Sequence, residues 1–206
     1  MTAAIDHLVV TAATLDAGAA YIRAALGVDL DQGGEHARMG THNRLLRLGE
    51  SVYLEVLAVN PTAPPPGRPR WFGLDVLAAD APPRLVSWVA RVSDIEGAAA
   101  RVAGAGRIER MARGALEWRI TISSDGSMPL DGVMPSLIEW DTPGHPAARV
   151  PDRGCRLVSL AGLHPQAERV REMLRDIDFA GPFTASQAAA ARLVATVETP
   201  GGVRTL

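Results

Sequence analysis

The chain contains little cysteine, few aromatic residues and no long apolar run. Its single cysteine, Cys155, cannot form a disulfide within the chain, which is typical of proteins from a reducing compartment. The segment MTAAIDHLVV lacks the basic stretch of a signal peptide. No apolar run approaches the ~20 residues that cross a bilayer. We therefore expect a cytoplasmic protein with no membrane partner.

The charge balance argues against a nucleic-acid partner. The formal net charge is −2, and the arginines are scattered along the chain instead of forming a basic stripe. No P-loop, dinucleotide fingerprint, GxSxG or CxxC pattern is present, so we expect no nucleotide cofactor. With 206 residues, of which 47% are hydrophobic, the chain is long enough to bury a substantial core.

One sequence pattern occurs twice along the chain. Residues 5–22 align without a gap with residues 85–102, so that Leu15 falls on Ile95 and Asp16 on Glu96. Each copy has an apolar run typical of a strand, an acidic turn and a short alanine-rich helix. A repeated strand–helix unit predicts two similar modules, which together would form a cleft.

The remaining patterns extend each copy to a strand, a helix and three strands. The predicted first module covers residues 1–60, a Pro-rich connector covers 61–84, and the second module covers 85–145. Residues 153–206 predict a partial third unit, βαββ, packed on the same domain. The sequence thus predicts an α+β protein with paired βαβββ modules.

Specific motifs accompany this order of elements. The first module contains GGEHARMGTHNRLLRLG followed by YLEVL, and the chain ends in TP-GG-x-x-TL. In these features it resembles the glyoxalase-like domain family of the vicinal oxygen chelate superfamily, which includes glyoxalases, extradiol dioxygenases and antibiotic-resistance proteins. The resemblance covers essentially the whole chain. It implies a curved mixed sheet that wraps around a divalent metal.

The resemblance also implies a ligand set for that metal. The superfamily's ligands lie on the first and last strands of each module, which offer His7, Glu55 and Glu139 here. The fourth position, which aligns with His7 in the second copy, is Ser87, a poor ligand. One imidazole and two carboxylates suit Zn²⁺, Ni²⁺, Mn²⁺ or Fe²⁺. Such a metal would chelate two adjacent substrate oxygens while Glu55 or Glu139 acts as the general base.

Each of these residues also has a structural explanation. His7 could bond a neighbouring backbone group, and Glu55 could pair with an arginine. Glu139 lies beside Trp140 in SLIEWD, and a register slip of one residue would turn its side chain away from the cleft.

A second group of residues predicts the substrate-binding wall. His36, Thr41 and Asn43 form the densest polar cluster and would line the mouth of the first module. Trp71 follows the connector and would form an aromatic wall. The alternatives are that Thr41 and Asn43 belong to a turn that bonds its own backbone, and that Trp71 plugs the core between the modules.

These features favour an enzyme acting on a small oxygenated metabolite, with isomerase, lyase or dioxygenase chemistry. The alternative is a metal-free protein that binds or sequesters a small molecule in the same cup, and a third possibility is an assembly module with an empty cleft. His7 with Glu55 favours the enzyme, whereas Ser87 favours the binder. The expected partner is a small-molecule ligand, and a homodimer is left open.

Overall fold

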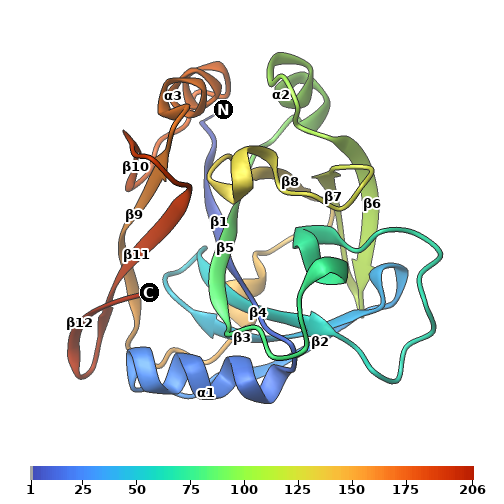
Figure 1. Ribbon diagram of the computed structural model, residues 1–206, viewed down its shortest axis with the longest axis vertical. Helices are drawn as coiled ribbons and strands as arrows, with labels where there is room; N and C mark the ends of the chain where they lie inside the picture. Colours follow the sequence, from blue (N-terminus) through green and yellow to red (C-terminus); the bar gives the residue numbers. More distant parts are fainter. Residues whose placement is uncertain (1) are drawn as a thin grey trace.

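The computed structural model describes residues 2–206, which form two β-sheets (Figure 1). The larger sheet has eight strands in the order β2-β3-β4-β1-β5-β8-β7-β6, and the smaller has four in the order β10-β9-β11-β12. Parallel and antiparallel pairs both occur in each sheet. The prediction of an α+β protein with paired modules and a curved mixed sheet is confirmed.

The first module begins with a strand and a well-capped helix. Thr14 accepts a hydrogen bond from the backbone N–H of Ala17, and Gly27 ends the helix with φ 74°, a conformation that suits glycine. The elements are β1 (Ala4–Thr11), α1 (Leu15–Leu26), β2 (Asp31–His36), the 3₁₀ turn η1 (Ala37–Met39), β3 (Thr41–Arg47) and β4 (Tyr53–Val59).

The second module repeats the start of the first. Strand β5 begins and ends at the positions that align with the two ends of β1, and helix α2 begins at the position that aligns with the start of α1. Beyond the helix the spacing between the copies is lost. The elements are β5 (Arg84–Arg91), α2 (Ile95–Arg101), β6 (Arg107–Arg113), β7 (Leu116–Ile122), the 3₁₀ turn η3 (Pro129–Gly132) and β8 (Ser136–Trp140).

The two modules join through β1 and β5, which pair antiparallel at the centre of the large sheet. Strand β1 also pairs parallel with β4, and β5 pairs parallel with β8. Along each strand, successive side chains point to opposite sides of the curled sheet. Leu54 and Val56 of β4 enter the main core, whereas Leu57 belongs to the inner cluster on the concave side.

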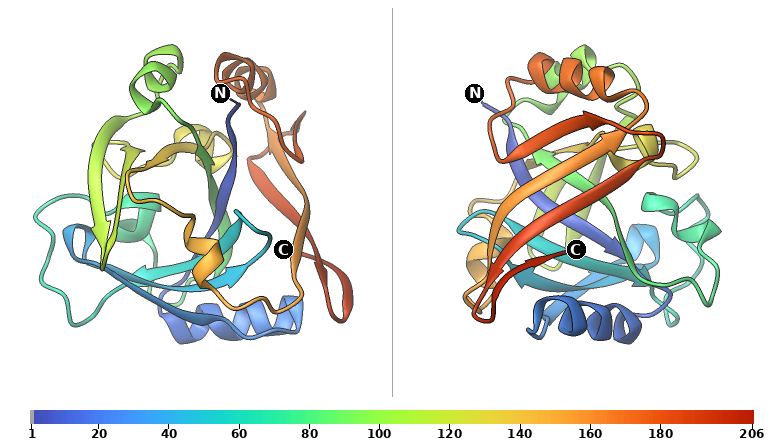
Figure 2. Two further views of the ribbon diagram at one scale, coloured as in Figure 1. Left: turned by 180° about the vertical axis from the view of Figure 1, so that it is seen from behind. Right: turned by 60° about the vertical axis from the view of Figure 1, so that its left-hand side comes forward.

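The third unit covers the convex side of the large sheet (Figure 2). It has one strand more than predicted. This strand, β10, was not expected, because its sequence FTASQ shows no apolar alternation and buries only Phe183. This Phe183 stacks on Trp88 of β5 at a centroid distance of 4.5 Å. The elements are the 3₁₀ turn η4 (Pro146–Arg149), which precedes the unit, β9 (Arg156–His164), α3 (Ala167–Asp176), β10 (Phe183–Gln187), β11 (Arg192–Thr199) and β12 (Gly202–Thr205).

This unit does not repeat the pairing of the first two. Its first strand, β9, pairs parallel with β10, the strand directly after the helix. In the modules, the first strand pairs parallel with the last strand instead. The limits 1–60, 61–84, 85–145 and 153–206 stay predictions as domain boundaries.

The connector lies against the concave side of the large sheet. It contains the 3₁₀ segment η2 (Trp71–Val76), in which Trp71, Phe72 and Leu74 are buried. All three belong to the inner apolar cluster together with residues of β7 and β8. None of the helices found in residues 2–206 combines the length and the apolar character needed to span a membrane.

Candidate functional site

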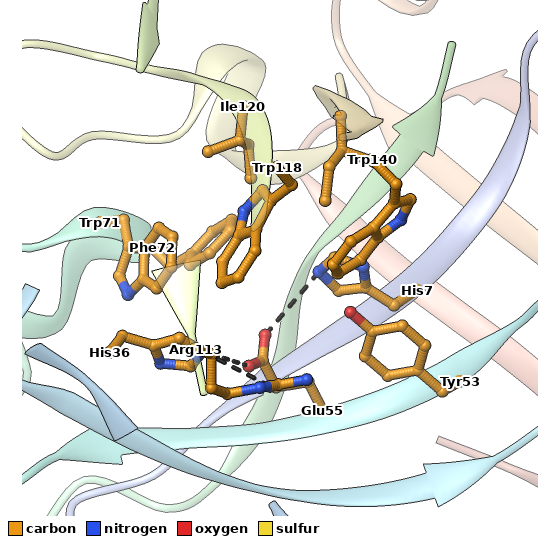
Figure 3. Close-up of a pocket in the computed structure, with 11 residues that line it drawn as sticks. His7, His36, Tyr53, Glu55, Trp71, Phe72, Arg113, Trp118, Ile120 and Trp140 are labelled. Atoms are coloured by element: carbon orange, nitrogen blue, oxygen red, sulfur yellow. Dashed lines mark hydrogen bonds and ion pairs between the residues drawn. The ribbon is translucent and has the colours of Figure 1, made fainter. Parts of the chain in front are cut away.

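The concave face of the large sheet contains a small pocket with a polar side and an aromatic side (Figure 3). Most polar groups come from the first module, and most apolar walls come from the second module and the connector. The lining residues are His7, His36, Tyr53, Glu55, Trp71, Phe72, Arg113, Trp118, Ile120, Ile138 and Trp140.

A bulge in β1 determines how the first polar pair is presented. The pairing of β1 with β5 shifts register between Ile5 and His7. Ile5 consequently joins the main core, while Asp6 turns to the same side as His7 and hydrogen-bonds to it from behind the pocket lining. Simple alternation would have placed these neighbours on opposite faces. The bulge thus lets one strand contribute two adjacent polar side chains to the same network.

Asp6 is fully buried and ties several groups together. Its Oδ1 accepts a hydrogen bond from His7 Nδ1 at 2.7 Å, and its Oδ2 accepts from Trp140 Nε1 and His145 Nε2, both at 2.9 Å. Burial by itself raises the pKa of a carboxyl, but the hydrogen bonds from His145 and His7 outweigh burial and hold the pKa of Asp6 well below its usual range. An ionised Asp6 therefore fixes the proton of His7 on Nδ1.

Glu55 lies at the centre of the polar side. Its Oε1 accepts a hydrogen bond from Asn43 Nδ2. Its Oε2 lies 3.7 Å from His7 Nε2, and its Oε1 lies 3.7 Å from His36 Nε2. The residue is 4% exposed, so the carboxylate is held among two imidazoles and an amide with little water around it. The structure thus brings together four of the predicted residues, His7, His36, Asn43 and Glu55.

The Gly-Gly pair of β2 orients Asn43. The backbone N–H of Gly34 donates to Asn43 Oδ1 at 2.7 Å, which leaves Nδ2 to donate to Glu55. A Cβ atom on Gly33 would lie 2.0 Å from the same Oδ1. Glycine is therefore needed for this close approach of β2. Asn43 holds Glu55 in place, in contrast to the alternative in which it only stabilises a turn.

His36 is buried between the two modules. Burial lowers the pKa of His36 to about 4, although Glu55 acts in the opposite direction. Its Nε2 lies 3.5 Å from Nη1 of Arg113, which can only donate, so Nδ1 carries the proton and donates to Thr41 Oγ1 at 3.1 Å. Thr41 is the first residue of β3 and positions His36 instead of lining the pocket.

Glu139 is not part of this cluster. On β8, Ile138 and Trp140 line the pocket, whereas the contacts of Glu139 lie outside it. Its Oε2 accepts a hydrogen bond from the backbone N–H of Ile95 at 2.8 Å, and its Oε1 pairs with Arg119 at 2.8 Å. Glu139 thus stabilises the start of helix α2, the outcome expected from a register slip of one residue.

The residues do not fit the implied metal centre. Besides the displaced Glu139, Ser87 at the fourth position donates its hydroxyl to the carbonyl of Trp88 at 3.4 Å. Within the part of the chain described, residues 2–206, no group of three or more His, Cys, Asp or Glu side chains is arranged to hold a metal ion. The expected His7, Glu55 and Glu139 set is not assembled, and we derive no chemical step through a metal.

Aromatic rings enclose the polar groups. Tyr53 stacks on His7 at 4.6 Å, and Trp71 meets His36 edge-on at 5.1 Å. Trp71 both lines the pocket and belongs to the inner core cluster, so the two predicted roles coincide. Burial, with the carboxylates of Asp6 and Glu55, raises the pKa of the Tyr53 hydroxyl well above its usual value, which keeps it neutral.

Several residues of the pocket and its supporting network were missed by the sequence-based prediction. Asp6 becomes part of the site only through the bulge. Arg113 and Trp118 reach the pocket because the large sheet curls, which brings β6 and β7 over the first module. Tyr53 alone had a usable signal, because it lies two positions before Glu55 in the YLE motif and alternation places both side chains on the same face of β4.

Comparison with known proteins gives a family match and likenesses of fold. The family described as "Glyoxalase-like domain" matches residues 5–177. A hypothetical protein from Staphylococcus aureus is 13% identical, with a TM-score of 0.64 over 93% of this chain and 88% of that chain. No curated protein matches in sequence.

Two methylmalonyl-CoA epimerase structures are also similar. One, in complex with methylmalonyl-CoA and NH₄⁺, is 19% identical, with a TM-score of 0.49 over 71% of this chain and 100% of that chain. The other, from Mycobacterium tuberculosis, is 17% identical, with a TM-score of 0.41 over 66% and 85%. At these identities, such likenesses concern the fold alone.

Proposed function

Because this chain belongs to the glyoxalase-like domain family, we propose that its pocket transfers a proton at a carbon next to a carbonyl group of a small oxygenated metabolite. The reaction would be of the isomerase or lyase type. The observation that carries the proposal is the buried Glu55 carboxylate, which Asn43 holds by one oxygen and which lies 3.7 Å from the Nε2 atoms of two histidines.

Glu55 would act as the general base. Asn43 occupies Oε1, so Oε2 is the oxygen that would take the proton from carbon. The electron pair of the broken C–H bond would move to the carbonyl oxygen of the substrate and form an enolate. Aromatic walls keep water away, which strengthens the electrostatic interactions of the charged groups.

His7 would stabilise the enolate oxygen. Asp6 holds its Nδ1 proton, so Nε2 is the ring atom that faces Glu55 and the pocket. In the doubly protonated ring, Nε2–H would donate to the developing oxyanion while Asp6 accepts from Nδ1–H. Asp6 acts through His7 and is a positioning residue.

The wall made by Trp71 and Phe72 would have to move to admit a substrate. In this conformation the pocket has room for about one water molecule. Phe72 has φ 53°, a conformation that is uncommon for a bulky side chain. Strain of this kind is often found in segments that change conformation around ligands.

Hydrogen exchange in D₂O tests the proposal. A panel of small 2-oxo and 2-hydroxy acids and ketones would be incubated with the protein, and loss of the C–H signal next to the carbonyl would be followed by ¹H NMR. We expect exchange with at least one compound and a loss of about 100-fold or more in Glu55→Gln. Glu139→Gln is the matched control, because this carboxylate binds the start of α2 and does not line the pocket.

Two results would refute the proposed chemistry: exchange that survives in Glu55→Gln, and no exchange with any compound. The assay would be run with a chelator and again with Zn²⁺, Ni²⁺, Mn²⁺ or Fe²⁺, because the family resemblance implies a divalent metal. Compounds that bind without exchanging would favour the second candidate, sequestration of a small molecule, which the largely aromatic lining also supports.

A further inference from the structure

Arg113 lies where the pocket meets a second hollow. It is the last residue of β6, and it lines both the inner pocket and an outer groove. Across residues 2–206, no ion pair joins its guanidinium to a carboxylate, whereas Arg119 of the next strand pairs with Glu96, Glu139 and Asp141. Arg113 is thus a cation without a carboxylate partner among the described residues, with His36 Nε2 as a neighbour at 3.5 Å.

The outer groove offers the space that the inner pocket lacks. Its other lining residues are Gln32, Gly33, Gly34, Glu35, Leu45, Gly114, Leu116, Pro146, Arg149 and Val150. A Cβ atom on Gly34 would lie 2.8 Å from Cδ of Arg113, so the bare backbone of β2 lets the arginine lie across it. A ligand could therefore place its reacting atoms in the pocket and extend past Arg113 into the groove.

A second donor lies in the pocket wall beside His36. Trp71 is 4% exposed, and its indole Nε1 has no hydrogen-bond partner in the described chain. Figure 3 shows this nitrogen on the side of the ring near His36, which also neighbours Arg113. A buried N–H without an acceptor is costly, so an acceptor supplied by a ligand would satisfy it.

From these observations we infer that Arg113 binds a carboxylate group of the substrate, with Trp71 Nε1 as an additional donor. The substrates of the pocket are then small carboxylic acids. The planar guanidinium can bind both oxygens of a carboxylate, and neutral His36 holds it in place without competing for the anion. This inference rests on the proposed function, since it names the class of compound on which Glu55 would act.

Calorimetric binding of pyruvate and pyruvamide tests the inference, because the two compounds differ mainly in the charge of one group. Wild-type protein should bind pyruvate at least about tenfold more tightly than pyruvamide. Arg113→Gln should lose that preference and keep its affinity for pyruvamide. Arg113→Lys should keep only part of the preference, because lysine retains the charge but lacks the paired N–H donors that bind both carboxylate oxygens. Arg110→Gln, on the same strand but largely exposed, should behave as wild type.

Several results would overturn the inference. These are equal affinity of wild-type protein for both compounds, unchanged pyruvate binding in Arg113→Gln, and inorganic phosphate binding as tightly as pyruvate. If Arg113→Gln does not fold, as judged by circular dichroism, full retention of the preference in Arg113→Lys overturns it instead. Binding is measured without turnover, so a failure of carboxylate binding can be distinguished from a failed exchange assay, which concerns the chemistry of Glu55.

Discussion

Acid should destabilise this protein through His36 at a pH where most carboxyl groups are still ionised. The ring is buried and neutral, with its pKa lowered to about 4 from 6.5. In the unfolded chain the ring takes up a proton as the pH falls below 6.5, whereas in the folded chain it does not until about pH 4. The unfolded state therefore binds more protons between these values, and the free energy of unfolding must fall as the pH is lowered.

The size of the effect follows from the two pKa values. At full extent a difference between 6.5 and about 4 corresponds to about 3 kcal/mol. Between pH 7 and pH 5 the contribution of His36 amounts to about 2 kcal/mol, because part of the transition lies outside that interval. Asp6 acts in the same direction, but its loss of stability begins only near the ordinary carboxyl pKa and continues below it, so it adds little between pH 7 and pH 5.

Urea denaturation at pH 7 and pH 5, followed by tryptophan fluorescence, measures the effect. We expect the pH-dependent loss to be about 2 kcal/mol smaller in His36→Gln than in wild type. His42→Gln is the matched control, since His42 is only half-buried and its pKa is lowered less strongly by burial. If wild type and His36→Gln lose the same free energy between the two pH values, the reasoning about His36 is refuted.

Two further predictions concern positioning and backbone shape. Asp6→Asn should lower the exchange rate about 100-fold and change its pH profile, because the His7 proton is no longer held by an anion. An unchanged pH profile would argue against the positioning role of Asp6. Gly132→Ala should destabilise the protein by about 3 kcal/mol or more in urea titrations, since its φ is 87° and the new Cβ would lie 1.8 Å from the Val86 carbonyl oxygen. Gly27→Ala, with φ 74° and open space around it, should cost only about 1 kcal/mol, and equal losses in the two variants would contradict the steric argument.

The local elements of the fold could be predicted from the sequence, and the contacts between distant strands could not. The repeat places β1 and β5 and the starts of α1 and α2 correctly, because apolar periodicity and capping residues act within a few positions. Strand β10 escaped prediction because an edge strand with a single buried residue lacks that periodicity.

The same difference between local elements and distant contacts explains which residues of the candidate site could be predicted. His7 and Glu55 lie together because β1 and β4 are neighbouring strands of one module. Glu139 was misplaced because side-chain direction on β8 depends on a register that the sequence does not reveal. Arg113 could not be found at all, since only the curling of the whole sheet brings the end of β6 to the pocket.

The unequal halves of the pocket have a stereochemical consequence. The first module supplies His7 and Glu55, while the second supplies the apolar groups Trp118, Ile120 and Ile138. A planar enolate held between them would have proton-transferring groups on one face and hydrocarbon on the other. Deuterium from solvent should therefore enter from a single side, so that a prochiral CH₂ group would be labelled with one handedness.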